Sequence, residues 1–308
     1  MNAVPAWRPQ RAVEIIAGTP PGGGLDRTAR ALARAIEATG MLDVALQVVN
    51  VPGDGARKAW AHVERRAGDP HVLAISSPNL VTDRLTGVTA FDHADFTPLA
   101  ILYNEYIAFI AGEGSGLTDA VDLLERFTAQ AGRVTVALST ALGNPNHIAL
   151  AKVIRHAGGD IRAPKLRVFD SALDALADVL SRHADVAAIT AASAVDALAG
   201  KTARALAVSA PTRLSGLYAD TPTWAEHAVD CTIGAWRGVT GPRGLGTAQV
   251  AYWQSVFDAA VGTDAWRADL DRHFWTGMYL AGAALHDYLR RENAEFRATL
   301  EELRLLRT

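Results

Sequence analysis

Short apolar segments alternate along the chain with longer segments whose apolar residues recur at helical spacing. The short segments are rich in β-branched residues and end at turn signals, which predicts buried strands. The predicted strands are Val13–Ala17, Leu46–Asn50, His71–Ser76, Val134–Ser139, Lys165–Phe169, Asp185–Thr190 and Ala203–Ala210. The predicted helices after the first are Ala56–Arg66, His147–His156, Ala172–Arg182 and an Arg- and Glu-rich helix, Leu285–Leu306, which we expect to be an exposed cover.

The first helix shows the pattern most clearly. Its apolar positions form one stripe, Leu25, Ala29, Leu32, Ala33 and Ile36, while arginines occupy the other faces. Asp26 stands at its start, where a carboxylate can accept hydrogen bonds from free N–H groups, and Gly40 is a typical helix end. The chain therefore reads strand, helix, strand from its beginning.

This alternation occurs in two separate blocks, each of which predicts a mainly parallel sheet flanked by helices. No low-complexity linker joins the blocks, so we expect strands near Ala100–Asn104 and Cys231–Gly238 to cross between two domains. The predicted domain I comprises residues 1–103 plus 232–308, and domain II comprises residues 104–231.

Composition removes several function classes. The chain has 308 residues, 49% of them apolar, and a net charge of -3, which is typical of a globular protein and gives no basic surface for nucleic acid. No apolar run approaches the ~20 residues of a membrane helix. The single cysteine, Cys231, excludes an intrachain disulfide and a zinc cluster, and we expect it to fill core space. The first residues lack a signal-peptide pattern, so the protein is either cytosolic or follows a removed leader.

The loop from Thr19 to Asp26 is the first candidate binding element. It joins a strand to a helix, the place where open parallel sheets bind ligands, and its glycines let a ligand approach the backbone. It matches neither a dinucleotide fingerprint nor a phosphate-binding P-loop. One interpretation is a tight connection that needs glycine; the other is an anion site at Pro21, Gly22, Gly23 and Gly24.

The second block repeats this arrangement from Ser139 to His147. Asn144 or Asn146 can cap the following helix, and Ser139 and Thr140 add hydroxyl groups. His147 is either a capping or supporting residue or a direct ligand contact.

Two further segments leave alternatives open. Asp170, between Phe169 and Ser171, either caps a helix or accepts a hydrogen bond from a ligand hydroxyl or amine. Arg237 either binds a structural carboxylate or reaches the ligand, and Trp236 is expected to pack at a hinge. We find no paired acids, nucleophile elbow or metal-ligand cluster, and this favours binding over catalysis, with no cofactor and no metal.

The ordered series TPPGGGLDRTAR, VVNVPGDGARKAW and GDPHVLAISSPNL resembles the substrate-binding proteins of tripartite tricarboxylate transporters, the Bordetella uptake family. The likeness continues through VFDSALDALADVLSRHADV to WRGVTGPRGL and covers nearly the whole chain. The residues that match the family's first two motifs are Pro20, Pro21, Gly22, Gly23, Asp26, Ala29, Arg30, Asn50, Pro52, Gly53 and Gly55. Leu25 and Asn144-Pro145-Asn146 depart from the family pattern.

The resemblance implies a two-domain fold of the periplasmic-binding-protein type (type II), with a ligand cleft between the domains. It implies that Pro21–Gly24 holds a ligand carboxylate through backbone N–H groups and bridging water, and that Ser139–His147 donates from the other domain. Segments matching Ser76-Ser77, Asp170-Ser171 and Thr190-Ala191 line the rest. Members are exported, so the resemblance implies a leader that has been removed and a periplasmic location.

These expectations define a function hypothesis. The protein captures a small carboxylate by domain closure and passes it to the membrane subunits of a tripartite tricarboxylate transporter, without catalysis, as a monomer. The alternatives are a two-domain enzyme that acts on a small organic acid through His147 and Asp170, and a ligand sensor without a transporter.

Overall fold

The computed structural model describes residues 7–307, which form two compact units. Within the described residues, unit 1 comprises residues 7–84, 88–104 and 236–294, and unit 2 comprises residues 85–87, 105–235 and 295–307. The sequence-based division differs mainly at the C-terminus, which it assigns to domain I. The contacts place this segment in unit 2, where the Arg307 amide donates to the Leu85 carbonyl, 2.9 Å away.

Unit 1 is built on a six-stranded sheet with the order β11-β4-β10-β3-β1-β2. Its strands are β1 (Val13–Ala17), β2 (Leu46–Asn50), β3 (Val72–Ser76), β4 (Thr97–Asn104), β10 (Arg237–Gly241) and β11 (Thr276–Leu280). β1 is parallel to β2 and β3, whereas β10 is antiparallel to β3 and β4. Because β1 and β3 are parallel neighbours, the loops that follow them emerge at the same edge of the sheet.

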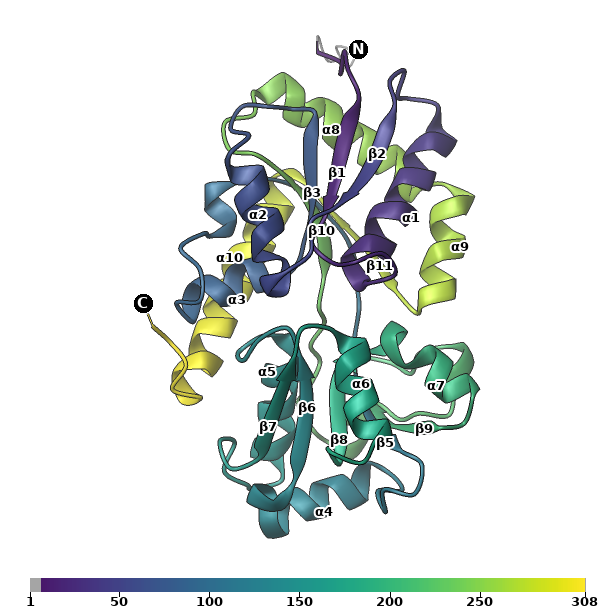
Figure 1. The fold of residues 1–308 in the computed structure, drawn as a ribbon, viewed down its shortest axis with the longest axis vertical. Coiled ribbons are helices and arrows are strands. Elements are labelled where there is room, and N and C mark those ends of the chain that lie inside the picture. Colours follow the sequence, from purple (N-terminus) through teal and green to yellow (C-terminus); the bar gives the residue numbers. More distant parts are fainter. Residues whose placement is uncertain (1–6, 308) are drawn as a thin grey trace. The chain divides into compact units, whose positions relative to one another are not determined.

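Helices cover this sheet and enclose an aromatic core. They are α1 (Gly24–Thr39), α2 (Arg57–Glu64), α3 (Asn79–Leu85), α8 (Thr247–Val261), α9 (Asp264–His273) and α10 (Gly282–Glu302). Figure 1 shows α1 next to α9, two helices that are far apart in the sequence. The Tyr103 ring stacks on Trp275 at 4.1 Å between ring centroids, and its hydroxyl lies 2.6 Å from that of Thr28 on α1. These contacts fix α1 on the sheet.

Unit 2 contains a five-stranded sheet with the order β7-β6-β8-β5-β9. Its strands are β5 (Ile107–Gly112), β6 (Thr135–Ser139), β7 (Lys165–Phe169), β8 (Val186–Thr190) and β9 (Ala203–Val208). Its helices are α4 (Ala120–Gln130), α5 (Pro145–His156), α6 (Ala172–Leu180) and α7 (Val195–Ala199), with α5 and α6 packed on the sheet (Figure 1). β6 is parallel to β7 and β8, so the loops before α5 and α6 share one edge.

The two-domain α/β prediction is confirmed, with two corrections. The sheets are mixed rather than mainly parallel, because β4, β5 and β10 return antiparallel to their neighbours. The last helix is also not simply an exposed cover. Its apolar residues Leu285, Leu289, Phe296 and Leu300 are buried at helical spacing. The expectation of an exposed helix came from the charged residues on its other face.

The β4–β10 pair leaves no room for a side chain at Gly238. A methyl group there would lie 2.5 Å from the Ala100 carbonyl oxygen, which belongs to strand backbone and cannot rotate away. We expect Gly238→Ala to lower the free energy of unfolding by about 1–3 kcal/mol, the usual cost of overpacking. Urea denaturation measures it. Gly277→Ala in edge strand β11 is the control, since its methyl meets only the end of the Leu270 side chain, at 3.3 Å; equal stability of the two variants would contradict this reading.

Candidate functional site

One buried carboxylate, that of Asp26, holds the loop between β1 and α1 in place. Asp26 is 2% exposed and accepts hydrogen bonds from the Gly22 amide (2.8 Å), the Asn50 side chain (2.8 Å) and Arg30 Nε (3.0 Å). Burial alone would raise its pKa, but these donors outweigh burial and hold the pKa of Asp26 below its usual range. Asp26 therefore fixes the shape of the loop, and Gly23, not Asp26, occupies the N-cap position of α1.

The same loop leaves two backbone amides available to a ligand. The Gly22 amide is bonded to Asp26 and the Gly23 amide to the Pro20 carbonyl, at 2.9 Å. Within the described residues, the amides of Gly24 and Leu25 at the start of α1 have no acceptor in the chain. They also lie at the positive end of the helix dipole. Of the amides in the predicted segment Pro21–Gly24, only that of Gly24 has no acceptor in the described chain, and the Leu25 amide next to it has none either.

Arg237 supplies a cation beside these amides. A methyl group built on Gly24 would lie 3.8 Å from Arg237 Nη2, while Arg237 Nη1 donates to the Trp236 carbonyl at 3.1 Å. The arginine is 8% exposed, so its charge acts where solvent screening is weak. Two free amides and a nearly buried guanidinium at one place are suited to a carboxylate.

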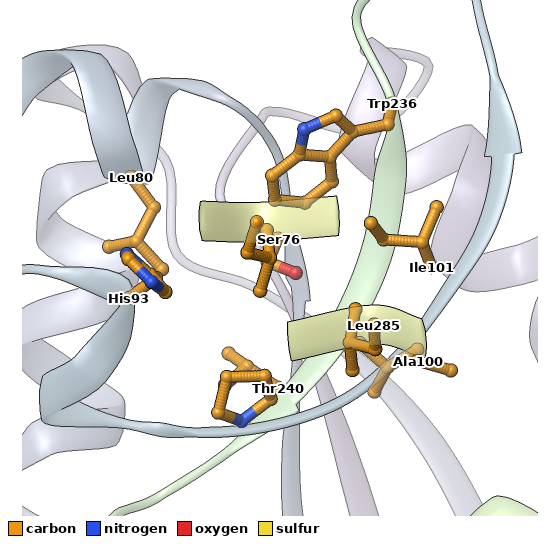
Figure 2. Close-up of a pocket in the computed structure, with 11 residues that line it drawn as sticks. Ser76, Leu80, His93, Ala100, Ile101, Trp236, Thr240 and Leu285 are labelled. Carbon is orange, nitrogen blue, oxygen red and sulfur yellow. The ribbon is translucent and has the colours of Figure 1, made fainter. Parts of the chain in front are cut away.

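Ser76 ends β3 and Ser77 follows it, and only Ser76 lines a cavity. Ser76 lines a small internal cavity, and Figure 2 shows it facing a mainly apolar space between Trp236 and Leu285. The cavity holds about 10 Å³, room for at most one water molecule, so no organic acid fits it. Ser77 lies just beyond the strand and is 6% exposed, the same fraction as Ser76. Because Ser77 does not line this cavity, it stays a predicted ligand contact.

In unit 2, the loop from Ser139 to His147 is fixed by neutral groups. Asn144 is the N-cap of α5: its side-chain oxygen accepts from the His147 amide (3.1 Å), and its NH₂ group donates to the Ser139 carbonyl (2.6 Å) and to Thr140 Oγ1 (2.8 Å). Asn146 donates to Ser139 Oγ at 2.9 Å. Of the two asparagines that the sequence offered, Asn144 is the cap.

Thr140 adopts a left-handed backbone conformation with φ of 69°. This is rare for a β-branched residue and costs on the order of 1–3 kcal/mol. Its amide donates to the Phe169 carbonyl at 2.7 Å, and its hydroxyl accepts from Asn144, so two contacts enforce the strained turn. Such strain is common at binding sites, which supports Thr140 as a site residue.

His147 contributes to the shape of this loop through its side chain. It is 3% exposed, and its Nδ1 accepts the Gly143 amide at 3.0 Å, which places the imidazole proton on Nε2. Burial lowers the pKa of His147 to about 4, so the ring is neutral near pH 7. The ring holds the Gly143 peptide in place. Because Nδ1 already accepts the Gly143 amide, that atom is poorly suited to act as a general base.

The remaining predicted residues lie at neighbouring strand ends. Ser171, not Asp170, caps α6, because its hydroxyl accepts the Asp174 amide at 3.1 Å; this corrects the capping interpretation of Asp170, which is exposed. Phe169 ends β7 and is half-buried. Thr190 ends β8 and is within 3.0 Å of the Ser193 hydroxyl, a partner that the sequence did not suggest.

Ala191 is held by backbone contacts. Its amide donates to the Tyr106 carbonyl, and its own carbonyl accepts the Tyr218 hydroxyl at 2.6 Å. Tyr218 was also missed, because an isolated tyrosine after a turn gives no local signal. Among the described residues no cluster of His, Cys, Asp or Glu could hold a metal ion, and no helix is long and apolar enough to cross a membrane.

Known proteins resemble this chain over most of its length. No protein-family model matches the chain. A UPF0065 protein from the tcbD-tcbE intergenic region of Pseudomonas sp. strain P51 is 25% identical over 306 residues, which cover 96% of this chain and 88% of that protein. A TctC solute-binding protein from Polaromonas, solved without ligand, is 26% identical, with 96% and 99% coverage and a TM-score of 0.70. The chain is therefore similar to UPF0065 and TctC proteins over almost its full length.

More distant structures share the fold. MatC from Rhodopseudomonas palustris, solved with malate, is 21% identical, with 95% and 100% coverage and a TM-score of 0.79. Rpa4515 from R. palustris, solved with adipate, is 22% identical, with 96% and 97% coverage and a TM-score of 0.83. Other matching structures are described as a periplasmic transporter and a periplasmic binding protein. These structures show the shared fold, and the UPF0065 and TctC matches confirm the family resemblance inferred from the motifs.

The free amides of α1 can be tested with Gly24→Ala. The added methyl meets only Arg237 Nη2 at 3.8 Å, so the fold is expected to persist, but it occupies space that a carboxylate needs. We expect affinity for a carboxylate ligand to fall at least about tenfold, the equivalent of one charged hydrogen bond. Titration calorimetry measures this.

The control for Gly24→Ala is Gly246→Ala, another glycine at a helix start, where the methyl approaches nothing closer than Gln249 Oε1 at 3.6 Å. Unchanged affinity in Gly24→Ala would remove the α1 amides from the site.

The neutral His147 predicts a pH effect on stability. Its pKa is about 4 in the folded protein and about 6.5 when unfolded, so the unfolded chain binds more protons between these values. Its contribution to stability is therefore lost as pH falls from about 6.5 to about 4, and amounts to roughly 3 kcal/mol. We expect His147→Asn, which keeps an acceptor for Gly143, to remove this contribution.

The measurement is urea denaturation of both proteins at several pH values. Asp83, whose pKa is raised to about 6 mainly by burial, acts in the opposite sense, so the difference between the two proteins isolates His147. A difference that does not change with pH would show that His147 is not buried in its neutral form.

Proposed function

We propose that this protein is an extracytoplasmic solute-binding protein that captures a small di- or tricarboxylic acid by closure of its two units. The observation that carries the proposal is the group formed by the Gly24 and Leu25 amides with Arg237 beside them. It acts in the periplasm and delivers the acid to the membrane subunits of a tripartite tricarboxylate transporter. The similarity to TctC and UPF0065 proteins supports this assignment.

The energetics of the unit 1 group are sufficient for useful affinity. Each hydrogen bond between a charged carboxylate and these donors contributes roughly 1.5–3 kcal/mol. A micromolar complex needs about 8 kcal/mol in total, after the costs of association. One carboxylate held by two amides and Arg237 accounts for a large part of this. A second polar group of the ligand is expected to complete it.

Unit 2 offers donors and acceptors without charge. Asn146, Ser139, Thr190 and Ser193 supply amide and hydroxyl groups, and α6 starts with a serine cap. Such groups bind a ligand hydroxyl or a second carboxylate equally well, so they do not select one acid. We propose the class of ligand, a small acid with at least two polar ends. The malate and adipate found in MatC and Rpa4515 belong to this class.

An enzyme and a transporter-independent sensor are the alternative functions. The enzyme would rely on His147, whose Nδ1 is occupied by the Gly143 amide, and on Asp170, which is exposed. No observation favours the sensor over the transport function.

A thermal-shift screen tests the proposal. Succinate, malate, adipate and citrate are compared with the corresponding neutral diamides, because a ligand that binds only the folded state raises the melting temperature, by the equivalent of about 2.7 kcal/mol at a hundredfold excess over Kd. We expect at least one acid and no diamide to do so. Arg237→Gln, referred to its own ligand-free melting temperature, should show a much smaller shift. No shift with any acid, or an undiminished shift in Arg237→Gln, would contradict the proposal.

A recovery experiment separates binding from catalysis. The acid that gives the largest shift is incubated with the protein and recovered for mass spectrometry. We expect it unchanged. A converted product that disappears in His147→Ala would favour the enzyme.

A further inference from the structure

A basic hollow lies on unit 1, where the start of α1 meets the end of α9. It has a volume of about 330 Å³ and is lined by Pro21, Gly22, Asp26, Arg27, Arg30, Arg34 and His273. Gly24, Leu25 and Arg237 do not line it. The hollow therefore differs from the carboxylate group described above, although both adjoin the same loop.

The cations in this region outnumber the carboxylates. Arg30 pairs with Asp26 at 3.0 Å, and Arg34 pairs with Asp269 at 2.7 Å. Arg272 also approaches Asp269, at 3.6 Å. Two carboxylates thus face three arginines before Arg27 is counted, and within the described part of the chain Arg27 has no carboxylate partner.

Arg27 is held in place but not neutralised. Its Nη1 donates to the Gly22 carbonyl at 2.8 Å, while its Nε is buried and has no acceptor in the described chain. Because Nε is buried, an anion in the hollow would contact Arg27 through the end of its guanidinium. The fork of a guanidinium is suited to the planar or tetrahedral oxygens of an oxyanion.

The pKa of His273 reflects the same excess of positive charge. Burial, followed by the charges of Arg27, Arg272 and Arg34, lowers its pKa, and the opposing effect of Asp269 does not compensate. A neutral imidazole at the wall adds a hydrogen-bond donor without adding charge. The charge that remains to be balanced is therefore that of the arginines.

We propose that this hollow is a second anion-binding site, which takes a small multivalent oxyanion through Arg27 with His273 at its wall. The inference goes beyond the proposed function, because it concerns residues that do not contribute to the carboxylate group. An anion here would also bind the arginine that holds the Gly22 carbonyl, so its presence would affect how firmly the loop is held.

Inorganic sulfate is the probe, titrated at constant ionic strength against sodium chloride and followed by the Nε–H resonance of Arg27 in NMR spectra. The resonance is assigned by its loss in Arg27→Lys. We expect sulfate to move it saturably, because an anion bound at the end of the same guanidinium changes the surroundings of Nε–H, and we expect chloride to move it far less. In Arg27→Gln the affinity for sulfate, measured by calorimetry, should fall at least about tenfold.

Gly24→Ala separates this proposal from the proposed function. If the hollow is the site, sulfate binds Gly24→Ala as it binds the parent protein. Loss of sulfate binding in Gly24→Ala but not in Arg27→Gln would place the anion at the α1 amides, which overturns the second site and leaves the proposed function intact. Linear, non-saturating shifts, or equal responses to sulfate and chloride, would also overturn it.

Discussion

The buried carboxylate of Asp26 is the interaction on which the candidate site depends. It ties together the β1–α1 loop, the next turn of α1 and the end of β2 through Gly22, Arg30 and Asn50. A buried carboxylate without such donors costs several kcal/mol, so the loop is not free to adopt another shape. Because Asp26 takes the Gly22 amide, the amides left for a ligand are those of Gly24 and Leu25.

The corresponding loop of unit 2 is also held in one shape, but by different chemistry. Its loop is held by the side-chain amide of Asn144 and the neutral imidazole of His147. The hydrogen bonds of the loop also offset the conformational cost of the left-handed backbone at Thr140. A charge pair determines the loop of unit 1, and hydrogen bonds between neutral groups determine the loop of unit 2. The positive charge suited to a carboxylate therefore comes from unit 1, through Arg237.

Local sequence rules located the elements well and the individual contacts less well. β1, β2 and β7 begin and end at the predicted residues, because short β-branched runs bounded by turn residues have few other solutions. The caps were harder to assign, because neighbouring Asp, Asn and Ser cap about equally well: the sequence left Asn144 and Asn146 open, and it suggested Asp170 where Ser171 is the cap. In the structure, the side chains of Asn144 and Ser171 accept the backbone amides at the helix starts, so these two residues are the caps.

By itself the sequence determined the alternation of strands and helices, the two blocks, and the ordered motifs that relate the chain to TctC-type binding proteins. Only the tertiary structure decided that Arg237 lies beside Gly24, that Asn50 completes the shell of Asp26, and that His273 faces Arg27. Hydrophobic periodicity and turn residues act over a few neighbours, so they are visible in the sequence. Contacts between residues on different strands and helices depend on sheet order and register, and mixed sheets such as these leave no local trace of either.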